Sequence, residues 1–202
     1  MAESNNTSQK KYGLVALVIL ALLAVFIIIT RNGFVQKEEN VTKTWNNVQS
    51  DYQRRLDLVP NLVSAVKASS DYEKETLTKL IEARAKAAQV NVSGNPTIED
   101  YNKVEAANGE VAISANKVIG VIEKYPDLKT TNSFVRLQDQ LIGTERRIKF
   151  SRNDFNKAIM EYNTAARSIP SSIVAKLFGF KVKDGFKADI GADKAPEITF
   201  TK

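Results

Sequence analysis

Hydrophobic residues near the amino terminus form one unbroken run with charged residues on both sides. Residues 14–29 are all apolar, and the uncharged segment extends over residues 12–30. As a helix, these nineteen residues would be about 28 Å long, close to the ~30 Å hydrocarbon core of a bilayer. Lys11 precedes the segment and Arg31 follows it. The pattern predicts a single membrane-spanning helix over residues 12–30, with the lipid bilayer as its partner.

Two other interpretations of this segment remain open. A cleaved signal peptide has a shorter apolar stretch and a cleavage site between small residues. Here the run ends in Phe26, three Ile residues, Thr30 and Arg31, which offer no such site. The chain also has no Cys that could carry a lipid. We therefore expect a retained single-pass anchor, with a cleaved signal or a buried soluble helix as the alternatives.

The charges beside the segment bear on which side of the membrane the rest of the chain occupies. Lys10 and Lys11 lie directly before the apolar run, as in the basic start of an uncleaved export signal. Arg31, Lys37 and Lys43 follow it, but large domains translocate largely regardless of charge. We expect the carboxyl-terminal region outside the cytoplasm, and a cytoplasmic location is the alternative.

Beyond the anchor, apolar residues recur at intervals of three and four, the period of a helix with one buried face. The first such stretch predicts a helix over about 34–68. Proline lacks the amide hydrogen that a helix interior uses, so we expect a kink or a short break near Val59–Pro60. The predicted inner face is Val41, Trp45, Val48, Tyr52, Leu56, Val59, Val63 and Val66.

Two further helices follow. The second begins at the capping pattern Ser70–Glu73 and ends before the turn cluster 92–96. Its predicted inner face is Leu77, Ile81, Ala85 and Ala88. The third begins at Thr97 and ends at Tyr125, before a proline. Its predicted inner face is Val104, Ala107, Val111, Ala115, Val118, Ile122 and Tyr125.

The fourth stretch, residues 132–167, has the most regular spacing by sevens. Its predicted inner face is Phe134, Leu137, Leu141, Thr144, Ile148, Ser151, Phe155, Ala158, Tyr162 and Ala165. Sustained heptads joined by short connections are typical of an antiparallel bundle with left-handed packing. The sequence therefore predicts an all-α protein in which an amino-terminal transmembrane helix is followed by an antiparallel four-helix bundle.

This fold divides the chain into three regions. Residues 1–33 carry the short amino-terminal segment and the membrane helix, and residues 34–170 form the bundle. Residues 171–202 form a tail that we expect to be partly docked, because a disordered tail is poor in aromatics and this one has Phe178, Phe180, Phe186 and Phe200. Within it, residues 171–177 predict a short helix, and residues 192–202 predict a mobile end.

Composition excludes several classes of function. The chain has no Cys and no His, which removes disulfides, thiol nucleophiles, the commonest metal ligand and the usual neutral-pH base. The net charge of +6 comes from 29 basic and 23 acidic residues that are interleaved. The densest basic cluster does not share one helix face, unlike a nucleic-acid stripe; it is Arg146, Arg147, Lys149 and Arg152. We expect no cofactor, no metal site and no nucleic-acid partner.

Glycines and polar residues also stand within the predicted helices. Gly109, Gly120 and Gly143 are isolated, and each should cost about 1 kcal/mol relative to Ala, so we interpret them as sites of close helix approach.

Several polar residues fall on inner faces, namely Arg55, Ser114, Thr144 and Ser151. One interpretation is a structural polar layer that fixes register. The other is a buried Arg–Glu network, between Arg55 and Glu145, that moves when a partner binds.

The motif over Gln53–Val63, read as a whole, resembles the LemA family of bacterial membrane-anchored proteins. The segments Glu82–Ala85, Tyr125–Lys129 and Phe178–Phe180 match the family pattern in order. So do positions of the fourth helix, which are Phe134, Leu137, Gln138, Leu141, Thr144, Glu145, Ile148, Arg152, Phe155, Asn156, Tyr162 and Asn163. The chain departs from the pattern in two places, since Phe155 stands where the family often has Tyr and Ile169 where an aromatic is usual.

The resemblance covers roughly residues 34–200 and implies an antiparallel four-helix bundle on a membrane helix, with no known reaction. The motif residues of unknown role are Arg54, Arg55, Asp57, Pro60, Asn61, Glu145, Arg152, Asn156, Tyr162 and Asn163.

We expect a membrane-anchored interaction or scaffold protein without catalysis, which binds a protein partner of unknown identity. The alternative is a membrane-surface sensor or a module that binds anionic lipid in the bacterial envelope. An enzyme would have to use Glu, Asp, Lys, Tyr or Ser alone. A homo-oligomer is compatible with the heptads, since such a face can be satisfied within one chain or between chains.

Overall fold

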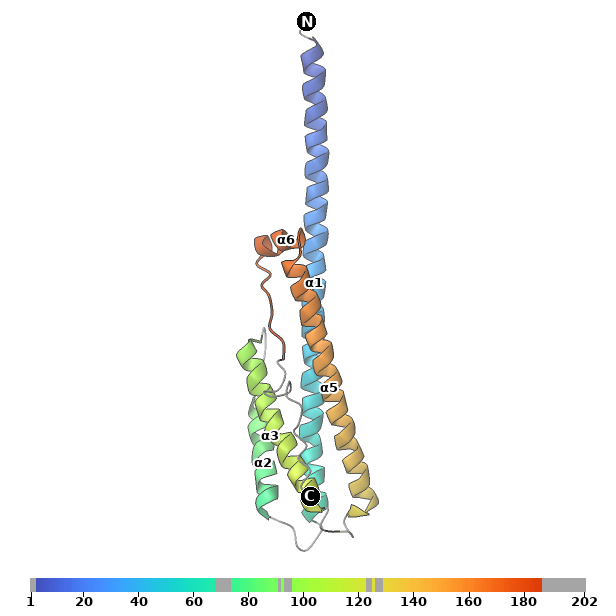
Figure 1. Cartoon of the computed structure of the whole chain (residues 1–202), viewed down its shortest axis with the longest axis vertical. Helices are drawn as coiled ribbons and strands as arrows, with labels where there is room; N and C mark the ends of the chain where they lie inside the picture. Colours follow the sequence, from blue (N-terminus) through green and yellow to red (C-terminus); the bar gives the residue numbers. More distant parts are fainter. Residues whose placement is uncertain are drawn as a thin grey trace, which may run out of the picture. The chain divides into compact units, whose positions relative to one another are not determined.

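The structure is a computed structural model that describes residues 3–67, 74–90, 92, 96–122, 125 and 129–186, and their side chains from residue 12 onward. These residues form helices and no strand, which confirms the all-α class. The helices labelled in Figure 1 are α1 (Glu3–Lys67), α2 (Lys74–Gln89), α3 (Ile98–Ile122), α5 (Asn132–Arg167) and α6 (Ser171–Phe178). The predicted helices over 132–167 and 171–177 are thus confirmed to within one residue. The predicted capping pattern at Ser70–Glu73, Phe200 and the predicted mobile end at 192–202 lie outside the described residues.

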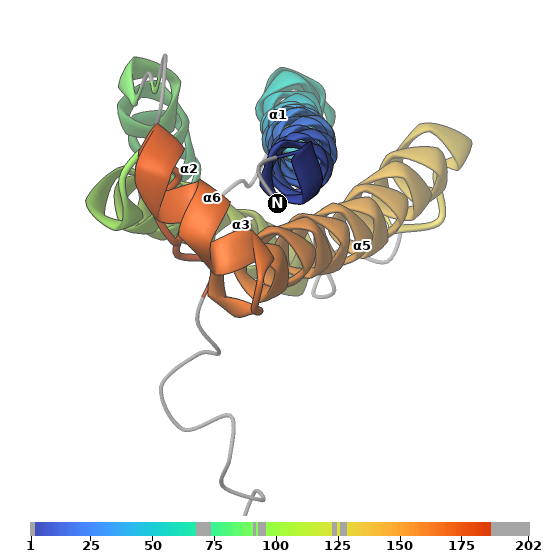
Figure 2. The ribbon, with the colours of Figure 1, turned by 90° about the horizontal axis from the view of Figure 1, so that it is seen from above.

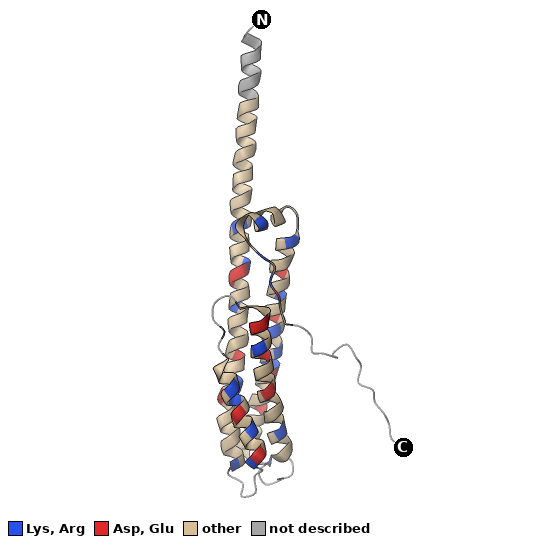
Figure 3. Ribbon diagram, turned by 90° about the vertical axis from the view of Figure 1, so that its left-hand side faces the viewer, with Lys and Arg blue, Asp and Glu red and all other residues tan. Residues whose placement is uncertain are grey.

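Helix α1 joins the predicted anchor and the first predicted bundle helix into one uninterrupted helix. From Tyr12 onward it contains a window of mean hydropathy 3.2, none of which is buried. It is therefore long and apolar enough to cross a membrane, and Figure 3 shows this stretch without charged residues. No proline separates the two parts, and Gly33 alone does not end the helix.

The described contacts divide the chain into two compact units. We call residues 12–45 with 157–183 the anchor unit, and residues 46–156 with 184–186 the bundle unit. Helices α1 and α5 each contribute to both units. The domain boundaries predicted from the sequence are not tested by this division and stay predictions.

Four antiparallel helices build the bundle unit, namely the carboxyl-terminal part of α1, helices α2 and α3, and the first part of α5 (Figures 1 and 2). They share one apolar core to which all four contribute; it includes Leu56, Val59, Leu62, Leu77, Leu80, Val111, Val118, Phe134, Leu137 and Leu141. The predicted inner faces on α1 and α5 are buried except for Ala165, which is half-buried. On α3 they are buried through Ile122, where the helix ends, and Tyr125 lies beyond it, half-buried.

The predicted inner face of α2 is wrong except at Leu77. Ile81 is 45% exposed, and Ala85 and Ala88 are also exposed. The buried residues are instead Leu77, Leu80, Ala83 and Ala87. Leu80 and Ile81 are adjacent and similarly apolar, so either of them could have defined the buried face. The alanines that follow occur all around the helix. Their small side chains give little preference for one phase, so packing of the other helices decides it.

Helix α3 begins at Ile98, one residue after the predicted start at Thr97, and Thr97 caps it. The Thr97 hydroxyl accepts a hydrogen bond from the Asp100 amide at 3.3 Å, and the Asp100 carboxylate accepts one from the Thr97 amide at 2.9 Å. The reciprocal pair satisfies two amides that a helix start leaves free. These hydrogen bonds from Thr97 also hold the pKa of Asp100 below its ordinary value.

Of the kink or short break expected near Val59–Pro60, the break does not occur, since α1 continues through Pro60 to Lys67; the kink stays a prediction. Proline at 60 cannot donate to the carbonyl of Leu56, four residues earlier. The Arg84 side chain of α2 supplies the missing donor, since its Nε lies 2.9 Å from the Leu56 carbonyl oxygen. An arginine from a neighbouring helix thus satisfies the acceptor that Pro60 leaves unpaired.

The interpretation of Gly109, Gly120 and Gly143 as sites of close helix approach is also wrong. A Cβ placed on any of them would meet no atom within 4 Å. Neighbouring helices do not come near these backbones, so space does not explain the glycines.

We predict that the stabilising effect of Arg84 depends on Pro60. Arg84→Met should lower the free energy of unfolding by about 1–2 kcal/mol, because the buried Leu56 carbonyl loses a charged donor. In a Pro60→Ala background the loss should be much smaller, since the backbone amide that this substitution restores then donates to that carbonyl. Denaturant unfolding of the four proteins of this double-mutant cycle measures the coupling. Arg54→Met, at an exposed position of α1, is the control, and equal costs in both backgrounds would contradict the interpretation.

Candidate functional site

A buried arginine joins three helices in the bundle unit. Arg55 of α1 is 5% exposed, and its guanidinium holds the Glu145 carboxylate of α5 through two bonds, from Nε at 2.7 Å and from Nη2 at 2.5 Å. Its Nη1 donates to the Asn108 carbonyl of α3 at 2.9 Å. The two parallel bonds to one carboxylate form the bidentate geometry that only arginine can make. The structure thus brings together the Arg55 and Glu145 that the sequence singled out.

Two other polar residues on inner faces, Thr144 and Ser151, are satisfied within their own helix. Thr144 is buried and donates to the Gln140 carbonyl at 2.8 Å, and Ser151 donates to the Ile148 carbonyl at 3.2 Å. Ser114 is half-buried. Such hydroxyl bonds to the preceding turn let small polar residues enter a core without a partner helix. Thr144 and Ser151 therefore do not contribute to the polar contacts between helices that Arg55 makes.

Arg152 and Asn156 of α5 hold the last described residue of the tail. Arg152 forms an ion pair with Glu105 of α3, and its guanidinium lies 4.6 Å from the centroid of the Phe186 ring. The Asn156 side chain donates to the Phe186 carbonyl at 3.2 Å and accepts from the Phe186 amide at 2.8 Å. The Phe186 ring also packs at 5.5 Å against Phe155. One asparagine therefore replaces the backbone partner that an extended residue would find in a sheet.

Asn163 repeats this pattern in the anchor unit. Its side chain donates to the Lys183 carbonyl at 2.7 Å and accepts from the Lys183 amide at 2.8 Å. The Lys183 ammonium pairs with Glu38 of α1 at 2.9 Å and lies 5.3 Å from the Tyr162 ring centroid. Burial raises the pKa of the Tyr162 hydroxyl above its ordinary value. Tyr162 and Asn163 thus both contact the tail residue Lys183.

Four motif residues on α1 take no part in these contacts. Arg54, Asp57, Pro60 and Asn61 are all exposed. The Asp57 carboxylate accepts a hydrogen bond from the side-chain amide of Gln53 at 2.8 Å, one turn earlier on the same helix. The motif residues therefore fall into three groups, which are the exposed face of α1, the polar contacts of the bundle unit, and the tail contacts of the anchor unit.

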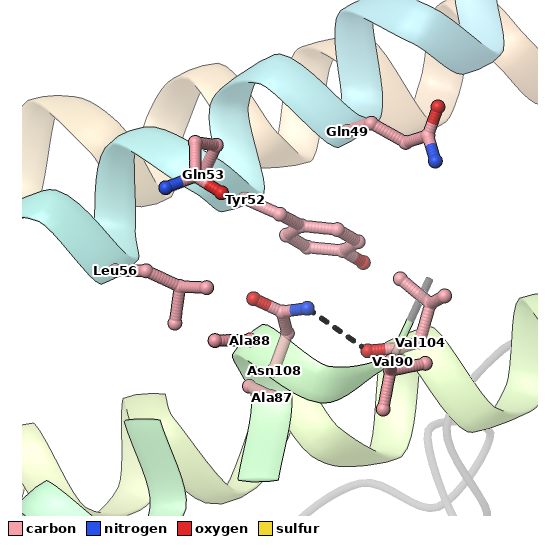
Figure 4. A pocket seen from close by; sticks show the side chains of 9 residues that line it. All are labelled: Gln49, Tyr52, Gln53, Leu56, Ala87, Ala88, Val90, Val104 and Asn108. Carbon is pink, nitrogen blue, oxygen red and sulfur yellow. Dashed lines mark hydrogen bonds between the residues drawn. The ribbon is translucent and has the colours of Figure 1, made fainter. Parts of the chain in front are cut away.

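A pocket of about 250 Å³ lies among α1, α2 and α3 in the bundle unit. Its lining residues are Gln49, Tyr52, Gln53, Leu56, Ala87, Ala88, Val90, Val104 and Asn108. Figure 4 shows Tyr52 and Asn108 reaching into it from α1 and α3. The Asn108 Nδ2 donates to the Val104 carbonyl at 3.1 Å, whereas its buried Oδ1 has no hydrogen-bond partner among the residues that the structure describes.

The pocket contains neutral polar groups only. None of its lining side chains carries a formal charge at neutral pH, because the only ionisable one is Tyr52 and burial raises the pKa of that hydroxyl to about 12. The Asn108 oxygen can accept a hydrogen bond from water or from a small neutral donor. Nothing in this lining suits proton transfer near neutral pH. Among the residues that the structure describes, no three acidic side chains gather as a metal site requires.

Sequence reasoning missed the pocket and the two asparagine contacts. Asn156 and Asn163 are seven residues apart, and each follows an inner-face aromatic, Phe155 and Tyr162. This repeat in the sequence could have indicated that a polar side chain lies next to the buried face of α5 at each of these two positions. The pocket left no such signal, since it depends on how α2 packs.

Together, a helix with a long apolar run, an antiparallel helical bundle and a pocket without charged groups define a class of protein, the membrane-associated helical bundle. The sequence comparison then gives the family. The LemA family matches residues 44–200, and the chain belongs to it.

Relatives carry two different names. The chain is 23% identical to "Magnetosome protein MamQ" of Magnetospirillum gryphiswaldense, over 92% of this chain and 75% of that protein. It is 23% identical to "Magnetosome protein MamQ 2" of Paramagnetospirillum magneticum, over 91% of this chain and 76% of that protein. It is 19% identical to "Protein LemA" of Metamycoplasma hominis, over 84% of this chain and 75% of that protein.

We predict that Arg55 and Glu145 are coupled in their effect on the free energy of unfolding. Glu145→Ala should lower the free energy of unfolding by about 2 kcal/mol, because it leaves a buried cation without its counter-charge. This figure is below the usual range for buried pairs because the Glu145 side chain is 46% exposed. Arg55→Met with Glu145→Ala should lose less than the sum of the two single changes.

Chemical denaturation of the full chain in detergent measures this cycle. The control is Glu75→Ala, which removes the exposed partner of Lys79 on α2 and should have no measurable effect. Strictly additive losses at positions 55 and 145 would show that the pair does not act as a unit.

Proposed function

We propose that this chain is a membrane-anchored interaction protein that binds a partner protein through the outward face of α5. One observation carries the proposal: an apolar stripe that is exposed in the described part of the bundle unit. Val135 and Ile142 are exposed, and Phe150 is 67% exposed. We call these three residues the α5 stripe.

The α5 stripe has the geometry of a second helix seam. At 100° per residue its members fall within a sector of about 80°, opposite the buried Leu141 and Ile148. Along the helix they extend over about 22 Å. Single exposed apolar residues are normal on a surface, whereas an aligned set on one helix favours a docking face. A partner helix of about fifteen residues would cover it.

Charge favours an acidic partner over a second copy of the chain. Four cations are exposed on this face, with Arg146 within the sector of the stripe and Arg136, Arg147 and Lys149 beside it, and none forms an ion pair with any residue that the structure describes. The exposed Asp139 also lies within the sector, so cations outnumber acidic residues there by four to one. Two copies meeting through this face would place these cations against their own counterparts. An amphipathic helix with Asp or Glu beside its apolar seam would pair with them. We therefore identify the partner by chemistry, as an acidic amphipathic segment of another protein.

The absence of catalysis is part of the proposal. It is supported by the pocket, whose lining offers neutral amides and a phenol of raised pKa. It is further supported by the lack of Cys and His in the whole sequence. The candidate membrane helix supports the membrane anchor. In this proposal the bundle unit acts by binding a partner protein.

Site-specific photocrosslinking in cells tests the partner. A photoreactive residue at position 142 or 150 of the full chain should crosslink to one acidic helical segment of one protein, mapped by mass spectrometry. The matched control is position 113 of α3, an exposed Ile that lies outside the stripe. Arg146→Glu with Lys149→Glu should abolish the crosslink without changing the melting temperature, because both side chains are exposed and unpaired.

Two results would overturn this proposal. Crosslinks from positions 142 and 150 to the same chain would show self-association instead. Crosslinks that are equally frequent from position 113, or that survive charge reversal, would show that the stripe does not select a partner.

We further propose that the bundle unit lies on the extracytoplasmic side of the membrane. The Lys10–Lys11 pair directly before the apolar run supports this orientation. Reporters fused after Lys202 test it: a phosphatase active only outside should be active, and a fluorescent protein that matures only inside should stay dark. The reverse pattern would place the α5 stripe in the cytoplasm and restrict its partner to proteins there.

A further inference from the structure

Helix α6 of the anchor unit leaves an apolar face uncovered. Its residues Val174 and Ala175 are buried, whereas Ile173 and Leu177 are 66% and 69% exposed. Ile173 and Leu177 are four residues apart and therefore lie on the same face, one turn from each other. Phe178, the last residue of the helix, is also exposed, as are Ile169 before the helix and Val182 after it. Exposure of this much apolar surface to water is unfavourable and indicates that another apolar surface covers it.

Two ring contacts fix α6 beside the end of the apolar run of α1. The Arg31 guanidinium lies 5.7 Å from the centroid of the Phe178 ring. The Phe180 ring stacks on Phe34, with centroids 4.9 Å apart and an interplanar angle of 19°. Phe34 is five residues beyond Ile29, the last residue of the run, which is about 8 Å along the helix. The end of α6 therefore lies at the depth where lipid headgroups surround a spanning helix.

The turn after α6 holds this placement. Gly179 has a φ of 77°, in the left-handed region that favours glycine, and the Phe180 amide donates to the Ala175 carbonyl at 2.9 Å. This closure of the helix end directs the chain from Phe178 straight to the Phe34 contact. Figures 1 and 2 show α6 lying across the direction of α1, so that α6 is roughly parallel to a membrane that α1 crosses.

The charges around α6 suit an anionic surface. Residues 162–183 contain no Asp or Glu. Arg167, Lys176 and Lys181 are exposed and have no ion pair with a described residue, whereas Lys183 is paired with Glu38. A short helix with exposed apolar residues, flanking cations and an orientation along the membrane has the properties of an interfacial helix.

We propose that α6 is a second membrane contact, which inserts Ile173 and Leu177 at the boundary of headgroups and acyl chains and holds Lys176 and Lys181 against anionic phospholipid. The ligand is therefore the lipid surface itself. The proposal requires the membrane anchor over residues 12–30 but not the partner of the α5 stripe. Contact with a second copy is disfavoured, because it would bring the unpaired cations of two α6 helices together.

Fluorescence of single-cysteine variants in lipid vesicles tests this contact. The chain has no native Cys, so Leu177→Cys, Val25→Cys and Lys43→Cys of the full chain each take one environment-sensitive label. Position 25 lies within the apolar run and serves as the membrane reference. Position 43 is exposed on α1 and lies about 21 Å beyond Ile29, so it serves as the aqueous control. All three native side chains are exposed, so labelling should not disturb the fold.

The label at position 177 should show blue-shifted emission and quenching by brominated lipid, as at position 25 and unlike position 43. The quenching should be stronger when phosphatidylglycerol is added to phosphatidylcholine, and high salt should remove that difference. Lys176→Gln with Lys181→Gln should also remove it, while the control Lys43→Gln should not.

Other results would overturn the proposal. If position 177 behaves like position 43 while position 25 is quenched, the anchor is correct and α6 does not touch lipid. If neither 25 nor 177 is quenched, the membrane anchor itself fails, and with it the basis of both proposals. A blue shift at 177 that lipid bromine does not quench, and that disappears when protein is diluted into more lipid, would show a second copy on this face.

Discussion

The bundle unit depends on one constraint, the neutralisation of the buried Arg55 guanidinium. An unpaired cation in that position would cost several kcal/mol, so the helices must come together in the register that supplies its partners. Glu145 of α5 provides two acceptors and the Asn108 carbonyl of α3 provides a third. A shift of α5 by one heptad would keep apolar residues in the core but would carry Glu145 about 10 Å away. The apolar seams allow several registers, and Arg55 selects one of them.

The same logic explains other motif residues as partners for backbone groups that ordinary secondary structure leaves unpaired. Pro60 frees the Leu56 carbonyl inside a helix, and Arg84 satisfies it from the neighbouring helix. The tail residues Lys183 and Phe186 belong to neither a helix nor a sheet, and the amides of Asn163 and Asn156 satisfy both backbone groups of each. Because buried backbone polar groups must be paired, this pairing is a structural reason for these side chains to stand at their positions.

How far the sequence predicts this fold depends on side-chain size. On α1 and α5, large residues such as Trp45, Tyr52 and Phe155 recur in one phase and define the inner face without ambiguity. On α2 the phase depends on adjacent Leu80 and Ile81 and on alanines, so tertiary packing decided it and the prediction failed there. The tail could be expected to dock from its aromatics, but an extended segment has no period that predicts its partners. The pocket is a product of packing between three helices, so no local pattern could announce it.

The same energetics apply to the two groups of exposed apolar residues outside the membrane run, the α5 stripe and the face of α6. We propose different partners for them. Burial of an apolar side chain favours association with any apolar surface, and it does not by itself distinguish a protein from a lipid. Distinction comes from what lies beside it. The α5 stripe has exposed cations within and beside it that form no ion pair with a described residue, which suits a helix with acidic residues. The face of α6 is short, and Phe178 and Phe180 fix it beside the end of the apolar run, where a bilayer is the nearest apolar phase. Position and charge, rather than hydrophobicity, are therefore the grounds on which we propose a different partner for each surface.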